Sequence, residues 1–237
     1  MDRYTRKNLK TDKFAQEVSH TFEFVAGHKT EVVRYGTAAV VVIALAVGIY
    51  FYMRYQAGVR EEALGRAFRM DEATVGPTPP PGSVALNFQT AAEKEKARSQ
   101  AFSELAAKYH GTQEGAIAAM YLASDAADKG NLADAEKRYR DIMDSAPDAY
   151  ASMARLALAN VCAAEGKNAE AEKLFRQAVA KPSVTVSKAE ATIQLGRFLG
   201  KSNPAEARKL LEPLRTERSS VSRAAVSALG DIALQTK

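Results

Sequence analysis

The sequence predicts an all-α chain in which one membrane-spanning helix is followed by a solenoid of stacked helix pairs. A run of 19 residues without a charged side chain, 35–53, lies between Arg34 and Arg54. A proline-rich stretch follows, and beyond it small and aromatic residues recur at a spacing near 36 residues. We therefore expect a tail over 1–34, a transmembrane helix over 35–53, a helical linker and proline-rich loop over 54–90, and a repeat domain over 91–237.

The composition excludes several classes of protein. A single cysteine among 237 residues rules out an internal disulfide framework and any cysteine-cluster zinc or iron–sulfur site. The three histidines, His20, His28 and His110, lie too far apart to form a helical ligand pair. Residues 91–237 hold 22 basic and 19 acidic side chains, so no dense basic face indicates nucleic-acid binding.

The uncharged run has the length of a membrane span. As a helix it would extend about 28 Å, close to the hydrocarbon core of roughly 30 Å. Tyrosine and phenylalanine gather at its ends, where aromatic rings favour the headgroup level. Both the run and the segment before it are too long for a cleaved signal peptide. We therefore expect an uncleaved signal anchor rather than the core helix of a soluble domain.

The charges around the span favour one orientation, with one count against it. The tail holds seven Lys and Arg residues against four in residues 54–70, which places the N-terminus in the cytoplasm. Counted only within about 20 residues of the span, the tail has two against four, which indicates the opposite. We favour a cytoplasmic N-terminus, because the alternative translocates a tail with twelve charged side chains.

The segments on either side of the span have helical patterns. Apolar residues recur at three- and four-residue steps in the tail, which predicts a short amphipathic helix. They are Phe14, Val18, Phe22 and Val25. This helix either lies on the membrane or a partner, or only leads into the span. Residues 54–75 are expected to continue the span as a helix, which the four prolines of 76–82 then end, as a spacer or as a proline-rich ligand.

Beyond residue 90 the chain repeats, which is the strongest pattern in the sequence. Residues 121–147 and 156–182 match at a spacing of 36 residues, with the prolines at 35. The matched pairs are Leu122/Leu158, Ala123/Ala159, Gly130/Gly166, Ala135/Ala171, Tyr139/Phe175 and Pro147/Pro182. Ala101 and Leu105 indicate an earlier unit, and Leu195 with Gly196 a later one. Each unit is predicted to be a pair of helices, 13–15 residues each, that stacks on its neighbours to bury its apolar face.

Each matched position has a physical role. Ala123, Ala159, Gly196 and Gly230 are expected to let a first helix approach its partner closely. The aromatic residues fill the space toward the next unit, the matched glycines permit the turn inside each pair, and the prolines end the second helices.

This combination resembles the tetratricopeptide repeat, in about three copies with end helices, although the first-helix tryptophan of that repeat is missing. The layout of the chain, and residues 101–137 in particular, resemble the bacterial YfgM-like family of ancillary Sec-translocon subunits. The resemblance implies an inner-membrane anchor, a periplasmic repeat domain, and association with the Sec translocon and a membrane-anchored periplasmic chaperone. The longer tail and the proline-rich insertion depart from that family.

Motifs for catalysis are missing from the sequence. It contains no phosphate-binding glycine loop, no nucleophile elbow and no zinc-protease motif. Cys162 falls on the interior side of a first helix, where it is expected to act as a small buried residue. His110 is expected at a helix end, near the last carbonyl groups. We therefore expect no enzyme activity and no cofactor.

The candidate binding site is a groove along the first helices of the repeats. By the repeat register, Met120, Leu156 and Ile193 are equivalent, and Asn160 and Arg197 are equivalent one turn later. This pattern predicts a partner-binding groove for apolar or extended segments, with Arg197 supplying a polar contact. Alternatively, another part of the chain, such as residues 54–75, covers this stripe.

The sequence and the resemblance together predict a non-enzymatic scaffold that links exported chains to periplasmic chaperones beside the translocon. Its expected partners are the translocon, the chaperone, exported polypeptide segments and membrane lipid, and not nucleic acid. An envelope assembly or division scaffold without a role in export is the alternative. A cytoplasmic adaptor is a third hypothesis, supported only by the four arginines after the span.

Overall fold

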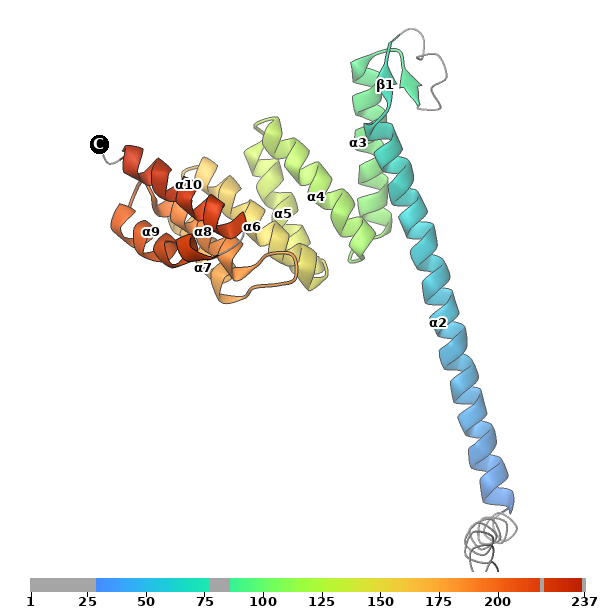
Figure 1. The fold of residues 1–237 in the computed structure, drawn as a ribbon. Helices are drawn as coiled ribbons and strands as arrows, with labels where there is room; N and C mark the ends of the chain where they lie inside the picture. Colours follow the sequence, from blue (N-terminus) through green and yellow to red (C-terminus); the bar gives the residue numbers. More distant parts are fainter. Residues whose placement is uncertain (1–28, 77–85, 218–219, 236–237) are drawn as a thin grey trace, which may run out of the picture. The chain divides into compact units, whose positions relative to one another are not determined.

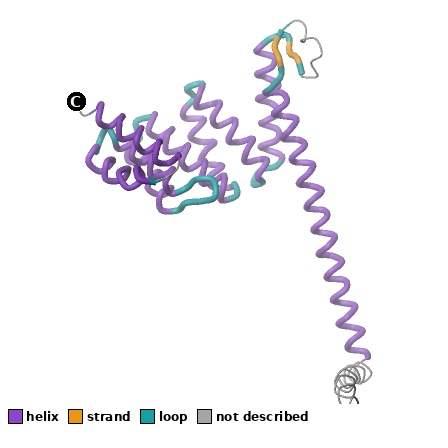
Figure 2. Tube along the Cα trace, in the orientation of Figure 1, coloured by secondary structure: helices purple, strands orange, loops and turns teal. Residues whose placement is uncertain are grey.

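The computed structural model describes residues 29–76, 86–217 and 220–235, and helices dominate these ranges (Figures 1 and 2). The chain divides into two compact units, 1–59 and 60–237. The all-α class predicted from the sequence is confirmed. The expected amphipathic helix of the tail and most of the proline-rich loop lie outside the described residues.

Helix α2 (Lys29–Asp71) contains the uncharged run and continues well beyond it. Among the described residues it is the one helix long and apolar enough to cross a membrane, and none of its most apolar stretch is buried. Large side chains along it face outward, with Ile43 62% and Phe51 64% exposed. The helix predicted over 54–75 is confirmed as far as Asp71.

The last residues of that predicted helix form a strand instead. Strand β1 (Thr74–Val75) pairs in parallel with β2 (Asn87–Phe88). The Thr74 hydroxyl donates to the side-chain oxygen of Asn87 at 2.8 Å, and the Asn87 amide donates to the Gly76 carbonyl at 2.8 Å. These contacts hold the backbone extended, which suits the β-branched residues Thr74 and Val75.

The end of α2 packs against α3 (Ala91–Lys108) and α4 (Gln113–Asp128). The buried members of this cluster are Ala67, Phe102, Leu105, Ala118 and Leu122. The ring of Phe102 stacks on that of Tyr121 with 4.0 Å between centroids. Arg60 on α2 binds the buried Glu114 of α4 at 2.9 Å. The last turns of α2 therefore serve as the first helix of a pair whose second helix is α3.

Arg98 on α3 ties the same three helices together by charge. Its guanidinium lies 3.2 Å from Asp71, 2.6 Å from Asp125 and 2.6 Å from Glu95. It also donates to the Tyr121 hydroxyl, which in turn donates to Asp71. Burial raises the pKa of Tyr121 to about 12, so this hydroxyl stays protonated and remains a donor. We call this set of five residues the Arg98 network.

Three further helix pairs follow in the order that the repeat spacing predicts (Figure 1). They are α4 with α5 (Leu132–Ser145), α6 (Asp148–Ala164) with α7 (Asn168–Ala180), and α8 (Lys188–Leu199) with α9 (Pro204–Leu211). The 3-10 helix η1 (Glu212–Thr216) and α10 (Ser220–Gln235) come after them. Helix α9 is shorter than the predicted 13–15 residues, because Pro213 has no N–H to continue the α-helical bonding.

Local signals explain where these helices begin and turn. The side chains of Thr112 and Ser187 cap α4 and α8 by accepting hydrogen bonds from backbone N–H groups in the first turn. Gly130 and Gly166, in the turns within two pairs, have φ of 77° and 78°. Only glycine adopts this left-handed conformation without strain, so the matched glycines are confirmed as turn residues.

The main core runs through α4 to α10 and contains the small and aromatic positions of the repeat. Ala123, Ala159 and Ala171 are fully buried, and Phe175 is 1% exposed. A Cβ atom added at Gly196 would lie 2.7 Å from the Leu211 side chain. Small residues therefore mark the close helix crossings in this part of the stack, as predicted.

Gly230 does not follow this pattern. It is exposed, and a Cβ added there would meet nothing within 4 Å. Helix α10 instead turns Ala225, Ala228 and Ile232 into the core. The predicted close crossing at Gly230 is therefore wrong, because α10 packs on the stack through a different face.

Candidate functional site

A groove of about 680 Å³ lies between α6, α7 and α8. Most of the side chains that line it are polar. The polar ones are Asn160, Asn168, Glu172, Gln194, Arg197, Lys201 and Ser202. Asn160, Arg197 and Lys201 are exposed. Hydrogen-bonding and cationic groups that converge on one open groove make it the candidate binding site.

Two of the predicted site residues meet in this groove. Asn160 on α6 and Arg197 on α8 occupy equivalent repeat positions and both line it. The Asn160 amide donates to the Leu156 carbonyl at 3.1 Å, which holds the side chain against its own helix. Lys201 follows four residues after Arg197, in the turn beyond α8. The repeat register therefore places an amide and one cation along this groove, and Lys201 adds a second cation.

The charges of the groove are unevenly paired. Among the described residues, neither Arg197 nor Lys201 has a carboxylate within ion-pair distance. The one acidic group in the lining, Glu172, is bound by Arg176 at 2.7 Å. The groove therefore offers two uncommitted positive charges.

The remaining lining of the groove is apolar. Phe175 on α7 is almost fully buried, whereas Phe198 on α8 is partly exposed. Their ring centroids are 5.3 Å apart. Ala163 and Ala169 continue this surface from α6 and α7. The groove thus combines a small apolar patch with polar and cationic groups.

The other three predicted site residues do not line this groove. Met120 and Leu156 are partly buried and pack against the main core. Ile193 is 2% exposed and belongs to that core, so it offers no surface to a partner in this conformation. The end of α2 packs elsewhere, on α3 and α4. Partner binding by all five predicted residues stays a prediction.

Sequence reasoning missed several residues of the groove. Asn168 and Glu172 come from the first turns of α7, a second helix, whereas the prediction considered only first helices. Lys201 lies beyond the last residue of α8. The four-residue step from Arg197 to Lys201 was the available sequence signal, because residues four apart share a helix face.

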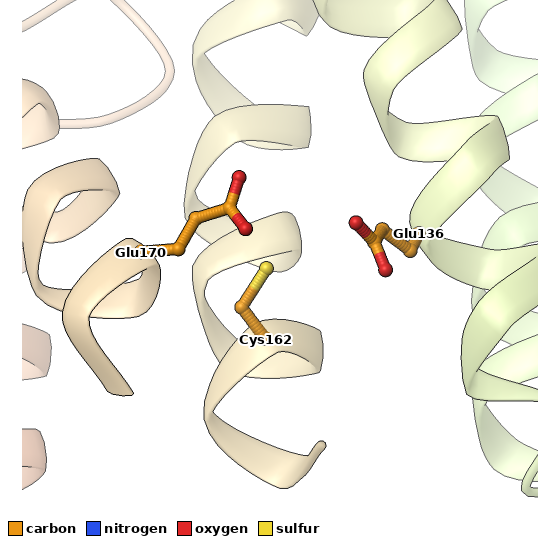
Figure 3. A group of neighbouring side chains, drawn as sticks. All are labelled: Glu136, Cys162 and Glu170. Atoms are coloured by element: carbon orange, nitrogen blue, oxygen red, sulfur yellow. The ribbon is translucent and has the colours of Figure 1, made fainter. Parts of the chain in front are cut away.

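Glu136, Cys162 and Glu170 form a second cluster, in which the potential metal-binding atoms lie within 4.8 Å of one another (Figure 3). Positive side chains already form ion pairs with both carboxylates. Arg140 lies 2.7 Å from Glu136 and 2.5 Å from Glu170, and Lys167 lies 2.5 Å from Glu136. These hydrogen bonds, first of all the one from Lys167, hold the pKa of Glu136 at about 2.

The thiol in that cluster is a poor metal ligand. Cys162 is fully buried, and burial raises its pKa, so the thiol stays protonated. This agrees with its expected role as a small core residue. The cluster is therefore an ion-paired contact between α5 and α7 rather than a metal centre.

The same type of ion-paired contact recurs at the next junction. Arg140 of α5 reaches Glu170 of α7, and Arg176 of α7 reaches Glu206 of α9 at 2.7 Å. Each arginine also binds the glutamate four residues before it in its own helix. We call these two arginine contacts the rungs.

A smaller pocket of about 220 Å³ lies among α3, α4 and α5. Alanines supply much of its lining, together with Ile142 and Leu122. At its rim, His110 lies 3.4 Å from Asp141. Its charged lining residues already have partners, since Arg138 binds Asp134 at 2.7 Å and Asp141 lies beside His110, so we regard this pocket as a space left between packed helices.

The fold and the groove define a helical-repeat protein with a candidate binding surface and an apolar N-terminal helix. The family model described as tetratricopeptide repeat-like domain matches residues 33–192. The chain therefore belongs to this family of repeat proteins. Comparison with curated proteins and with solved structures finds no match.

Proposed function

We propose that this chain is a non-enzymatic scaffold, anchored in the bacterial inner membrane by α2, that holds segments of other polypeptides in the groove between α6, α7 and α8. Tetratricopeptide repeat-like domains are protein-interaction modules, and the family model covers the apolar helix from residue 33 and the repeats as far as residue 192. The observation that carries the proposal is the groove itself, where Asn160, Arg197 and Lys201 are exposed.

The proposal extends to the place of action. The resemblance to the YfgM-like family supports a cytoplasmic N-terminus, a periplasmic repeat domain, and association with the Sec translocon. In this role the repeats would contact newly exported chains and a membrane-anchored periplasmic chaperone, while α2 contacts membrane lipid.

Topology is the first experiment. A reporter enzyme that is active only after export is fused to Lys237, and a cytoplasmic reporter is fused to the same residue in a parallel strain. We expect activity only from the exported reporter. The reverse result would end the export role and make the chain a cytoplasmic adaptor.

The second experiment tests protein binding at the groove. A photo-crosslinking amino acid replaces Asn160 in the full chain in living cells, and a matched variant carries it at the exposed Arg223 of α10. We expect adducts with exported chains or translocon subunits from position 160 and few from position 223. Adducts with envelope-assembly proteins alone would favour the alternative scaffold, and equal labelling from both positions would argue against the groove.

A further inference from the structure

We propose that the groove selects an extended polypeptide segment that carries acidic side chains next to an apolar one. This inference rests on the proposed function and specifies the chemistry of the partner. It is carried by three features of the groove lining, namely unpaired cations, free amide groups and a small apolar patch.

The cations favour carboxylates. Arg197 and Lys201 line the same groove, and among the described residues neither lies within ion-pair distance of a carboxylate. The acidic side chain of the lining, Glu172, pairs instead with Arg176, whose guanidinium donates two hydrogen bonds to its Oε1 at 2.7 and 2.9 Å. An acidic side chain entering the groove would therefore gain charge-assisted hydrogen bonds without displacing an existing partner.

The amides favour an extended backbone. A segment without secondary structure carries unpaired N–H and C=O groups that need partners when they lose water. The Asn160 side chain commits one N–H to Leu156, and the Gln194 side chain commits one to Glu190 at 3.0 Å. Their carbonyl oxygens remain acceptors and their second N–H groups remain donors. Both side chains line the groove.

The apolar patch favours one uncharged side chain beside the acidic ones. Phe198 is partly exposed and packs near Phe175, and Ala169 adds a further exposed apolar contact. In an extended segment, neighbouring side chains point to opposite sides, and residues two apart point to the same side. An acidic residue and an apolar residue can therefore reach the cations and the aromatic patch from one stretch of chain.

The charge of the groove is too small for a nucleic acid. Two cations face it together with one carboxylate, whereas binding to a phosphate backbone uses a larger cluster of Lys and Arg. The acidic polypeptide is therefore the better match in charge.

The test measures binding of defined peptides to the full chain in phosphatidylcholine nanodiscs. Three fluorescein-labelled dodecapeptides share four leucines and four serines and carry glutamate, glutamine or lysine at the other four positions. Fluorescence anisotropy should show the glutamate peptide binding roughly tenfold more tightly than the glutamine peptide. Raising the salt concentration should reduce this difference, and the lysine peptide should bind most weakly.

Matched charge reversals locate the effect. The double variant Arg197→Glu with Lys201→Glu should weaken binding of the glutamate peptide roughly tenfold. The same variant should bind the lysine peptide more tightly than the unchanged protein does. The control combines Lys209→Glu with Arg223→Glu, which changes the net charge equally on exposed residues outside the groove. The control should stay within about twofold of the unchanged protein.

Three results would overturn the inference. They are equal binding of the glutamate and glutamine peptides, equal weakening by the control, and displacement of the glutamate peptide by an equal concentration of single-stranded DNA. If one of these occurs while position 160 still crosslinks to polypeptides in cells, only the acidic preference fails. If that crosslinking is also lost, the proposed function fails with it.

Discussion

The first junction of the repeat stack lies between the pair α2–α3 and the pair α4–α5. Different contacts stabilise it from those that stabilise the later junctions. Between α5 and α7, and between α7 and α9, an arginine of one second helix reaches a glutamate of the next. Among the described residues, no arginine or lysine joins α3 to α5 in this way. A pocket to which alanines contribute part of the lining lies there instead.

The difference follows from the residues at equivalent positions. When Leu105 is aligned with Tyr139, Ala106 of α3 stands where α5 has Arg140. Alanine can neither form a rung nor fill the space that an arginine stem covers. The first pair is instead held from its other side, by the Arg98 network and the aromatic cluster with α2. The buried residues form two clusters that divide within α4, since Ala118 and Leu122 pack with α2 and α3 whereas Ala123 and Ala126 belong to the main core.

This contrast shows that the junctions of a repeat stack need not share one chemistry. Stability in such a stack is close to a sum of terms from each unit and each neighbouring interface. The first interface depends on the Arg98 network and on buried helix contacts near α2, and the later ones have the rungs. The predictions below use urea unfolding of the detergent-solubilised full chain, followed by circular dichroism at 222 nm.

The largest effect is expected from Gly115→Ala at the first junction. A Cβ there would overlap the backbone carbonyl of Tyr109 and lie 2.6 Å from its carbon. Since the backbone would have to shift, the free energy of unfolding should fall by about 3 kcal/mol. The position equivalent to Gly115 in α6 is Ala151, where Ala151→Gly should cost only about 1 kcal/mol. Equal losses would mean that the turn between α3 and α4 is not specially crowded at Gly115.

A somewhat smaller loss is expected from Arg98→Ala. This change leaves the carboxylates of Asp71 and Asp125 partly buried without their shared partner. We expect a loss of about 2 kcal/mol, below the range for fully buried pairs because the side chains retain some exposure. The control Arg66→Ala breaks an exposed pair within one helix and should cost less than about 0.5 kcal/mol. Similar results for both would show that the network adds little.

Acid should weaken both the Arg98 network and the rungs. Hydrogen bonding from Lys129 lowers the pKa of Glu95, and that from Lys167 holds the pKa of Glu136 at about 2. Carboxylates with lowered pKa stabilise the fold above their unfolded pKa near 4.5 and lose that contribution as pH falls through the folded pKa. Stability should therefore be flat near neutral pH and fall below about pH 4.5.

Variants can assign this acid response to residues. Replacing Glu136 with Gln should remove the part of the loss closest to pH 2, and replacing Glu95 with Gln should remove a further part of the loss below about pH 4.5. An acid response that is unchanged in both variants would place the titrating groups elsewhere.

The sequence predicted the repeat fold well because its signals are local or periodic. Gly130 and Gly166 mark turns by their conformational freedom, and small residues at 36-residue spacing mark the helix crossings. The Arg98 network could not be predicted in this way. Its acidic partners lie in three different helices, at positions 71, 95 and 125, so tertiary packing decides the pairing.

The sequence predicted only part of the groove, because the repeat register gives equivalent positions whereas tertiary packing decides which of them are exposed. The register found Asn160 and Arg197, because equivalent positions on first helices share a side of the stack. It also assigned Ile193 to an open surface, whereas the packing of neighbouring helices buries that side chain. A periodic pattern shows that residues are equivalent in position, but their exposure depends on neighbours that the pattern does not contain.

The rungs themselves should each contribute modestly. Arg140→Ala should lower the free energy of unfolding by about 1 kcal/mol and Arg176→Ala by about 0.5 kcal/mol. The first loss should be larger because Glu136 is only 15% exposed, against 38% for Glu172. Arg138→Ala, which breaks an exposed pair inside α5, should cost about 0.3 kcal/mol. If either rung variant loses no more stability than Arg138→Ala, the rungs do not stabilise the later junctions.

The smallest effect tests whether the first junction is underfilled. Ala107 is exposed and lines the pocket near Ile142 and Ala146, so Ala107→Leu should place apolar atoms in space that is otherwise solvated. We expect a gain of about 0.5 kcal/mol in the free energy of unfolding. Ala92→Leu, on the exposed first turn of the same helix, controls for helix propensity and should change stability by less than about 0.2 kcal/mol. If Ala107→Leu is neutral or destabilising, movement of neighbouring side chains already fills the pocket. The first and the later junctions would then differ only in their charged contacts.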